Sequence, residues 1–387
     1  MRMLFVAGGS PSTVFPLVPL ATAVRNVGHE VVVAVTDYAV ESVTHAGLSA
    51  TSVSSTHMFE YMFKDRTGRP ISELPDPEQA TDPHVSLISH GHGMGRLAAG
   101  CLDRLVSFCE DWRPDVIIGS TLSFAAQIAA SRFGIPYVKH AVCPGEPPDV
   151  DRGAEAELAP ELERFGLDRL PAGDLVIDIC PPSVRPLANP APAQSMRYVP
   201  GNTQRGLEPW MYTRPDRPRV VVTSGSRVAK GFQLEDLIAQ AKKITPLDME
   251  VVVAVSDHVA EEVRQAVPGV WAGWVPLDVV LRTSDLVVHG GGGNTMLTAI
   301  VAGIPQLGIP VQPKQASMQE RLVARGAGME LTLADATPDT VAKACRGLVE
   351  TPSYREQAQE LSVENAAQPS PAEVVGVVEA LVDGWDK

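Results

Sequence analysis

The sequence has no apolar run long enough to cross a membrane. A spanning helix needs about 20 mostly apolar residues, whereas the amino-terminal run in "MRMLFVAGGS" stops at two glycines. The same run is too short for the core of a signal peptide. We therefore expect a cytoplasmic protein with no membrane partner.

Positive charge and cysteine are also scarce. The 387 residues include 32 Lys and Arg against 46 Asp and Glu, which gives a formal net charge of -14. Because binding to a phosphate backbone needs basic surface, nucleic acid is excluded as a partner. The five cysteines show no Cys-x-x-Cys spacing, which argues against a disulfide framework and against a zinc site. We expect them to be buried as small apolar residues.

Apolar residues, by contrast, make up 44% of the chain. That is enough for more than one core in a chain longer than about 250–300 residues. Val- and Ile-rich runs alternate with helix-like stretches in two series, from "MLFVAG" to "IPYVKHAV" and from "RVVVTSGS" to "PQLGIP". Continuous runs of this kind are typical of parallel strands covered on both faces. The pattern predicts an α/β fold with two Rossmann-like, doubly wound parallel-sheet domains that face a cleft.

Composition suggests where these domains begin and end. We place the first domain at residues 1–203 and the second at 219–370. Residues 204–218, rich in Arg and Pro, are typical of an exposed linker. A last helix, 371–387, is expected to pack back on the first domain.

Residues 50–96 do not follow the alternation, and we interpret them as a long loop. Only 5% of the chain is aromatic, yet this segment gathers bulky side chains at Met58, Phe59, Met62 and Phe63. Two interpretations stay open: the side chains pack under the loop, or they line an apolar pocket for a ligand.

The most unusual stretch is "HGGGGNTM", residues 289–296, between the strand-like "DLVV" and the helix-like "LTAIVAG". Each glycine costs about 1 kcal/mol relative to alanine in ordered structure. A helix start carries unpaired N–H groups and the positive end of the helix dipole, and bare backbone lets phosphate approach it. The glycine run therefore predicts an anion-binding site. The loop "GGSPSTVF" lacks the G-x-G-x-x-G spacing of a dinucleotide site, and no P-loop motif is present.

Residues 273–328, which contain this run, resemble the donor-binding segment of family 1 glycosyltransferases of the GT-B fold. The closest likeness is to the actinobacterial enzymes that attach deoxysugars to polyketide antibiotics, C-glycosyltransferases among them. The similarity extends to "FPLVPLATAVRNVGHEVVVA" and "RPDVIIGSTLSFAAQIAASRFGIP" and so covers most of the chain. It implies an inverting, metal-independent transfer of a deoxyhexose from a dTDP-sugar to a phenolic aromatic polyketide, as a C- or O-glycoside. The dTDP-sugar is then a co-substrate, no cofactor is needed, and a homodimer is allowed.

The resemblance assigns residues to the donor. The diphosphate is implied to contact the glycine run, at His289, Gly291, Gly292, Gly293, Asn294 and Thr295. It is implied to contact the small residues after "RVVVT" as well, at Ser224, Gly225 and Ser226. Trp274 and the Val275 backbone are implied to face the nucleobase. Where relatives carry Asp-Gln for sugar hydroxyls, this chain has Lys314 and Gln315, which fits a sugar with fewer hydroxyls or a lysine that reaches the diphosphate.

The base that would deprotonate the acceptor is not evident. Many relatives place a histidine in the first loop, but here that loop offers only hydroxyls such as Ser10. Candidates follow the strand "YVKHAV", at His140 and Asp149, with Glu146 and Asp151 as neighbours. A phenol ionises near pH 10, well below an alcohol, so a phenolic acceptor would reduce the need for a strong base. We interpret the "DVD" motif at 149–151 as a solvated loop and not as a metal site.

Two alternatives to a transferase remain. A nucleotide-sugar epimerase could use the same fold, but it offers no use for the apolar segment around Phe59. A two-lobed ligand-binding protein without catalysis would normally be exported, and the sequence shows no export signal.

Overall fold

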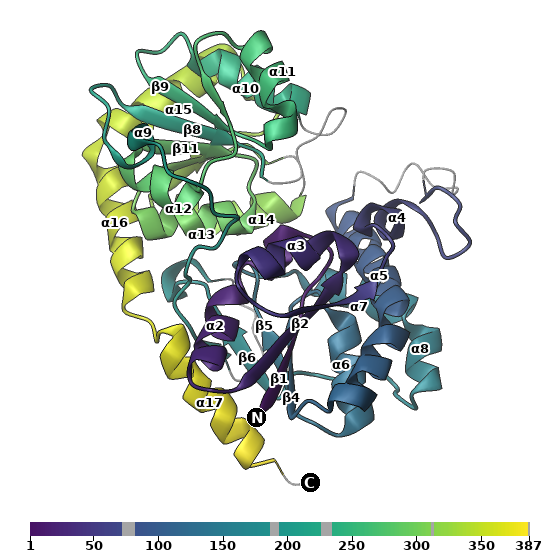
Figure 1. Cartoon of the computed structure of the whole chain (residues 1–387). Coiled ribbons are helices and arrows are strands. Elements are labelled where there is room, and N and C mark those ends of the chain that lie inside the picture. Colours follow the sequence, from purple (N-terminus) through teal and green to yellow (C-terminus); the bar gives the residue numbers. More distant parts are fainter. Residues whose placement is uncertain (72–81, 186–192, 226–233, 311–312, 386–387) are drawn as a thin grey trace. The chain divides into compact units, whose positions relative to one another are not determined.

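The computed structural model describes residues 1–71, 82–185, 193–225, 234–310 and 313–385. The chain divides into two compact units. Unit 1 is formed by Met1–Ile179, Leu187–Met196 and Pro369–Lys387, and unit 2 by Cys180–Pro186 and Arg197–Gln368. Each unit has a parallel sheet with helices packed on its faces (Figure 1). The predicted α/β class with two parallel-sheet domains is therefore confirmed.

The sheet of unit 1 has the strand order β3-β2-β1-β4-β5-β6-β7, with every pair parallel. The order reverses between the neighbours β1 and β4, which makes their carboxyl ends the topological switch point of this sheet. The strands are β1 (Arg2–Val6), β2 (Glu30–Thr36), β3 (Ala50–Ser54), β4 (Val116–Ser120), β5 (Tyr137–His140), β6 (Leu175–Asp178) and β7 (Ala193–Ser195). The helices are α1 (Pro11–Val14), α2 (Val18–Asn26), α3 (Asp37–His45), α4 (Met58–Phe63), α5 (Pro83–Trp112), α6 (Phe124–Phe133), α7 (Pro148–Glu157), α8 (Ala159–Arg164) and α17 (Pro371–Asp383).

Unit 1 holds the largest departure from expectation, because much of 50–96 is regular structure. The segment contains β3, α4 and the first turns of α5, a helix of 30 residues. Glycines of α5 lie where this helix meets its neighbours. A Cβ on Gly91 would overlap the Val150 carbonyl oxygen of α7, and one on Gly93 would lie 2.6 Å from the Met62 Sδ of α4. Close helix packing therefore explains these glycines.

The sheet of unit 2 has the order β10-β9-β8-β11-β12-β13, again all parallel, with its switch point between β8 and β11. The strands are β8 (Arg219–Thr223), β9 (Glu250–Ala254), β10 (Trp271–Gly273), β11 (Leu286–His289), β12 (Gln306–Gly308) and β13 (Gly328–Glu330). The α-helices are α9 (Pro209–Tyr212), α10 (Leu234–Ile244), α11 (Asp257–Ala266), α12 (Leu277–Val280), α13 (Gly293–Ala302), α14 (Pro313–Ala324), α15 (Pro338–Glu350) and α16 (Pro352–Ala366). Short 3-10 helices are η3 (Pro182–Val184) and η4 (Leu281–Thr283).

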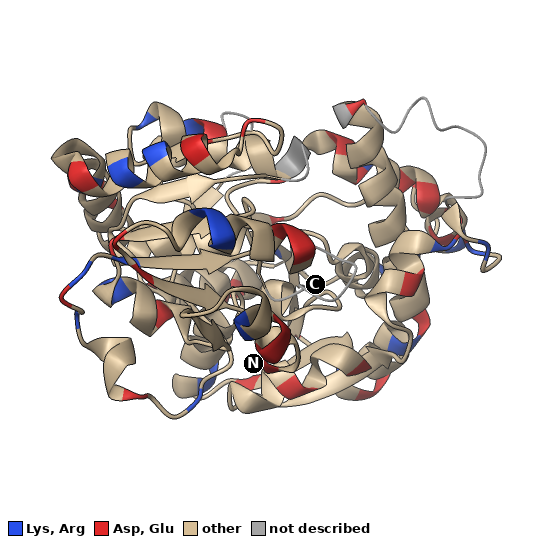
Figure 2. Ribbon diagram, turned by 90° about the horizontal axis from the view of Figure 1, so that it is seen from above, with Lys and Arg blue, Asp and Glu red and all other residues tan. Residues whose placement is uncertain are grey.

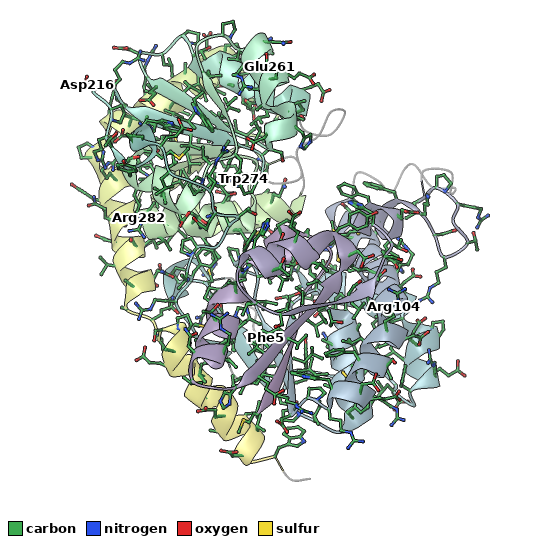
Figure 3. The ribbon with its side chains drawn as sticks, viewed as in Figure 1. Phe5, Arg104, Asp216, Glu261, Trp274 and Arg282 are labelled. Carbon is green, nitrogen blue, oxygen red and sulfur yellow. The ribbon has the colours of Figure 1, made fainter. Side chains whose placement is uncertain are left out.

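The strand cores show why Val and Ile dominate these runs. In β8, Val220 and Val222 enter one apolar cluster while Val221 enters another. Successive side chains point to opposite faces, so a strand covered on both faces needs apolar residues at every position. In unit 1, Phe5 of β1 is buried in the same way (Figure 3). All five cysteines are buried thiols, as expected.

Residues 204–218, expected to be an exposed linker, belong to unit 2. They contain α9, in which Met211 is buried and Trp210 stacks near Trp271 with ring centroids 4.8 Å apart. The helix α17 belongs to unit 1 and packs against α2, where His29 Nε2 lies 2.6 Å from Glu379 Oε1. The carboxyl-terminal helix is thus part of the unit that the chain begins with.

The structure also shows how charged and apolar residues are distributed over the helices. Acidic and basic residues are interspersed along the helices (Figure 2). Among the described residues, no helix is long and apolar enough to span a membrane.

Candidate active site

The glycine run lies at the switch point of unit 2. Strands β8 and β11 are paired so that Thr223 is opposite His289, and the loops after both strands begin at the same level. A Cβ placed on Gly290 would lie 4.0 Å from Ser224 Oγ, so the two loops approach each other. The Thr223 hydroxyl accepts the Gly225 N–H at 3.1 Å and donates to the Ala254 carbonyl at 2.9 Å. A cavity here is lined by residues from both loops and from α10.

The glycines in this run have different reasons to be glycine. Gly291 has a φ of +79°, and a Cβ there would lie 2.7 Å from the Cβ of Gln315. Only glycine fits at such a position. Gly290 and Gly292 are open towards the residues that the structure describes, where the nearest atoms to a Cβ would be 4.0 Å and 3.8 Å away. Packing inside the protein does not require them to lack a side chain, so their bare backbone is available to a ligand.

Helix α13 begins directly after the run. Its N-cap is Gly292, which has no side chain with which to cap the helix, and its first turn contains no acidic residue. The N–H groups of a first helical turn have no partners within the helix, and the helix dipole adds partial positive charge there. With open space over Gly290 and Gly292, this helix start has the properties of an anion-binding site.

The His289 side chain stabilises the loop after β11 through hydrogen bonds. Its Nδ1 accepts the Gly291 N–H at 3.0 Å, and its Nε2 donates to Gln306 Oε1 at 3.0 Å. The Gln306 Nε2 in turn donates to the Met296 carbonyl of α13 at 3.2 Å. Burial lowers the pKa of His289 to about 4, so the ring is neutral at pH 7. Both ring nitrogens are bonded within unit 2, so a contact between this side chain and phosphate would require one of these bonds to be exchanged, and that contact stays a prediction.

The other donor candidates lie in or beside this site. Gln315, on α14, packs against Gly291, while the side chain of Lys314 and all of Ser226 lie outside the described residues. Trp274, labelled in Figure 3, is half-buried, and its indole Nε1 donates to the Thr203 carbonyl at 2.9 Å. Its backbone N–H donates to Asp257 Oδ1 at 2.9 Å. The Val275 side chain is buried.

The four apolar acceptor candidates in unit 1 have different environments. Met58 is buried in the core, which favours the packing interpretation for that residue, and Phe59 and Met62 are partly buried against the same core. Phe63 is 58% exposed. Phe59 and Phe63 belong to a row of four rings that continues through His57 to Tyr38, with neighbouring centroids 5.9, 5.0 and 4.4 Å apart. Tyr38 is 56% exposed.

The three catalytic candidates, Ser10, His140 and Asp149, each have a different hydrogen-bond partner. The Ser10 Oγ lies 2.9 Å from the Ser12 Oγ in the loop after β1. His140 is fully buried at the end of β5, its Nδ1 donates to the Ala141 carbonyl at 2.7 Å, and burial lowers its pKa to about 4. A ring that no solvent reaches is poorly placed to take a proton from a substrate.

Asp149 has a partner that the sequence did not suggest. Its Oδ2 lies 2.8 Å from the Nδ1 of His84 on α5. The two residues are 65 positions apart, and nothing in their spacing predicts the contact. Asp149 also lies in the first turn of α7 and not in a solvated loop. In the part of the chain that the structure describes, no group of three or more His, Cys, Asp or Glu residues is arranged to hold a metal ion.

Two Rossmann-like units, each with its own switch point, have the architecture of the GT-B fold, and the solved structures that the chain resembles are glycosyltransferases. The particular family follows from two matches. The family described as "Erythromycin biosynthesis protein CIII-like" matches with its N-terminal domain over residues 22–225 and with its C-terminal domain over residues 238–381. The chain belongs to this family and is an enzyme.

Similar proteins support this assignment over nearly the whole chain. An L-demethylnoviosyl transferase of Streptomyces niveus is 31% identical, covering 97% of this chain and 96% of the relative. An aclacinomycin-T 2-deoxy-L-fucose transferase of Streptomyces galilaeus is 26% identical, covering 98% and 96%. The Streptomyces sp. SF2575 glycosyltransferase SsfS6 in complex with thymidine diphosphate has a TM-score of 0.85 and 34% identity, covering 98% and 99%.

Proposed function

We propose that this glycosyltransferase moves a deoxyhexose from a dTDP-sugar to a phenolic aromatic polyketide in antibiotic biosynthesis, as a C- or O-glycoside with inversion and without a metal. Unit 2 would bind the donor and unit 1 the acceptor. The observation that carries the donor half is the uncapped start of α13 with open space over Gly290 and Gly292. The thymidine diphosphate complex of SsfS6 and the deoxysugar named for the Streptomyces galilaeus relative support the donor class.

The diphosphate would bind to backbone amides and not to charged side chains. The N–H groups from Gly292 to Thr295 supply donors at the helix start, and Ser224 supplies a hydroxyl from the neighbouring loop. His289 acts as a positioning residue, because its bond to the Gly291 N–H holds the loop in register with α13 through Gln306. Preorganised donors of this kind stabilise charge without having to reorient.

The reaction requires charge stabilisation at the leaving group. The acceptor oxygen, or a ring carbon ortho or para to a phenolate, forms a bond to the anomeric carbon from the face opposite the diphosphate. The bond between that carbon and the diphosphate breaks, and the diphosphate keeps the electron pair. In O-transfer the acceptor hydroxyl loses its proton, whereas in C-transfer the ring carbon that formed the bond loses its proton and the ring becomes aromatic again. Helix dipole and amides at the start of α13 stabilise this developing charge.

The row of rings from Tyr38 to Phe63 is the surface of unit 1 that suits an aromatic acceptor. Its end members are more than half exposed, and neighbouring rings are spaced for aromatic contact. A planar polyketide can stack on such rings, so Phe59 and Phe63 keep their acceptor role in this proposal while Met58 supports them from the core.

Thermal denaturation with dTDP tests the donor assignment. At a hundredfold excess over its Kd, a ligand stabilises its protein by about 2.7 kcal/mol. We expect dTDP to raise the Tm and NAD to leave it unchanged. A shift with NAD or free sugar but none with dTDP would disprove the assignment.

Turnover with a dTDP-deoxysugar and a panel of phenols, followed by mass spectrometry, tests the acceptor class. Acid treatment of the product then separates the two linkages, because O-glycosides hydrolyse and C-glycosides survive. We expect EDTA to leave the rate unchanged. A rate that disappears with EDTA and returns with Mg²⁺ or Mn²⁺ would rule out the metal-independent mechanism.

A further inference from the structure

We propose that His84, oriented by Asp149, is the base that takes the proton from the acceptor hydroxyl. This inference rests on the proposed function and names the base that the first loop of unit 1 does not supply.

The pair has the geometry of a base and its orienting acid. The His84 Nδ1 lies 2.8 Å from Asp149 Oδ2, and the other oxygen of that carboxylate lies 2.9 Å from Arg152 Nη1. The Asp149 side chain is only 12% exposed, whereas that of His84 is 77% exposed. With Nδ1–H donated to the carboxylate, the neutral ring carries its lone pair on Nε2, which is the tautomer that accepts a proton.

The fold brings these residues together at the ligand-binding edge of the sheet. Helix α7 starts after β5, so its first turn lies at the carboxyl end of the strands. Helix α5 ends three residues before β4 and is 30 residues long, about 45 Å against about 17 Å for a five-residue strand. Its first turns therefore extend beyond the carboxyl edge of the sheet (Figure 1). Gly91 and Gly153 let α5 and α7 approach closely enough for the pair to meet.

The charges around His84 favour its protonated form. Asp149 raises its pKa by hydrogen bond and by charge, Asp82 raises it by charge, and Arg152 of α7 opposes them. The pKa of Asp149 is lowered, chiefly by its hydrogen bond to His84. Because the base acts when deprotonated, kcat/KM should rise with pH as His84 loses its proton, at a pH above the usual value for histidine.

The proton transfer balances without a further reactant. The Nε2 lone pair takes the hydroxyl proton while the acceptor oxygen forms its bond to the anomeric carbon. The imidazolium that results is stabilised by Asp149, and the proton then passes to solvent. His140, the histidine that the sequence analysis named as a candidate base, is buried with its Nδ1 bonded to the backbone.

The test uses full-length enzyme with dTDP-L-rhamnose and two acceptors, 2-naphthol and its more acidic 1-nitro derivative. We expect His84→Gln to lower kcat/KM for 2-naphthol by about 100-fold or more, the usual range for loss of a general base. The nitro acceptor, already ionised at the assay pH, should lose far less. The control His45→Gln removes an exposed histidine of α3 that pairs with Glu41, and it should leave both rates unchanged.

Asp149→Asn tests the positioning role separately. It should move the acid limb of the kcat/KM profile to lower pH, since the group that raises the pKa of His84 is gone, and NMR titration of the His84 ring should show the same shift. Equal losses for both naphthols in His84→Gln, or an unmoved limb in Asp149→Asn, would overturn the inference. Binding of dTDP should be unchanged in both variants, so failure of the donor assignment would appear in the wild-type enzyme and would be distinguishable.

Discussion

The two units share one topology but use it differently. In each sheet the strand order reverses between two adjacent strands, β1 and β4 in unit 1 and β8 and β11 in unit 2. After β1 the loop is filled by side chains, since a Cβ on Gly9 would lie 3.0 Å from the Met58 Cβ, and only the four-residue α1 follows. After β11 the loop is open at Gly290 and Gly292, and the ten-residue α13 follows at once. The two switch points therefore differ in the space beside the loop and in the length of the helix that follows it, and not in a side-chain cap.

The two units also differ in where their histidine side chains lie. In unit 2, the His289 side chain is buried and accepts a hydrogen bond from the Gly291 backbone N–H. In unit 1, His84 is exposed on a helix that extends past the sheet and is held by the carboxylate of a second helix. In the proposed mechanism, unit 2 would therefore act through backbone amides and unit 1 through side chains.

A negative charge in the open loop of unit 2 should have the largest effect. We expect Gly290→Asp to weaken dTDP binding by about 100-fold or more, because a carboxylate beside the diphosphate is strongly repelled. The isosteric Gly290→Asn adds the same volume without charge and should weaken binding much less. Isothermal titration calorimetry of both variants checks this. Equal dTDP affinities of the Asp and Asn variants would mean that the diphosphate does not bind beside Gly290.

Filling Gly291 should damage the fold of unit 2 and not only its binding. Alanine there must adopt a φ of +79° and displace Gln315, so we expect the free energy of unfolding to fall by about 2–3 kcal/mol. Gly290→Ala, where a Cβ meets open space, should change it by less than about 0.5 kcal/mol. The transition that dTDP raises in calorimetry identifies unit 2. A Gly291→Ala variant as stable as the wild type would contradict the positive φ and the close contact with Gln315 at this position.

Each unit contains a buried strand-end histidine, and here the two should behave alike. Burial lowers the pKa of both His140 and His289 to about 4, below the ordinary 6.5, so the unfolded chain binds protons more readily than the folded one. Stability should therefore fall as pH drops from about 6.5 towards 4, by about 2 kcal/mol per histidine at pH 5.

Calorimetry between pH 7.5 and pH 5 measures this effect. His140→Asn should flatten the dependence for unit 1 and His289→Asn for unit 2, whatever the cost of each substitution at pH 7.5. If the stability of a unit still depends on pH after its own buried histidine is replaced, that histidine is not held neutral in the folded protein.

The smallest effect concerns the carboxyl terminus. The Trp385 Nε1 donates to the Gly134 carbonyl at 3.0 Å within unit 1. Trp385→Phe removes this bond and should lower the stability of unit 1 by about 1 kcal/mol or less. The unit 2 transition and dTDP affinity should not change. A change in dTDP affinity would mean that the end of the chain influences the donor site.

Local pattern was sufficient for much of the fold. The runs around Val221 and Val287 became central strands, because a strand buried on both faces must be apolar throughout. The glycine run was located at a strand-to-helix junction for the same local reason. Pattern failed for α5, because glycines that serve helix contacts are the same residues that mark loops.

By itself, the sequence determined the fold class, the family and the position of the bare helix start, since period, composition and motif order are properties of neighbouring residues. Only the tertiary structure decided that β8 lies beside β11, that both nitrogens of His289 are bonded within unit 2, and that Asp149 meets His84. These contacts join residues separated along the chain, and they depend on how helices and strands pack. No local pattern records that packing.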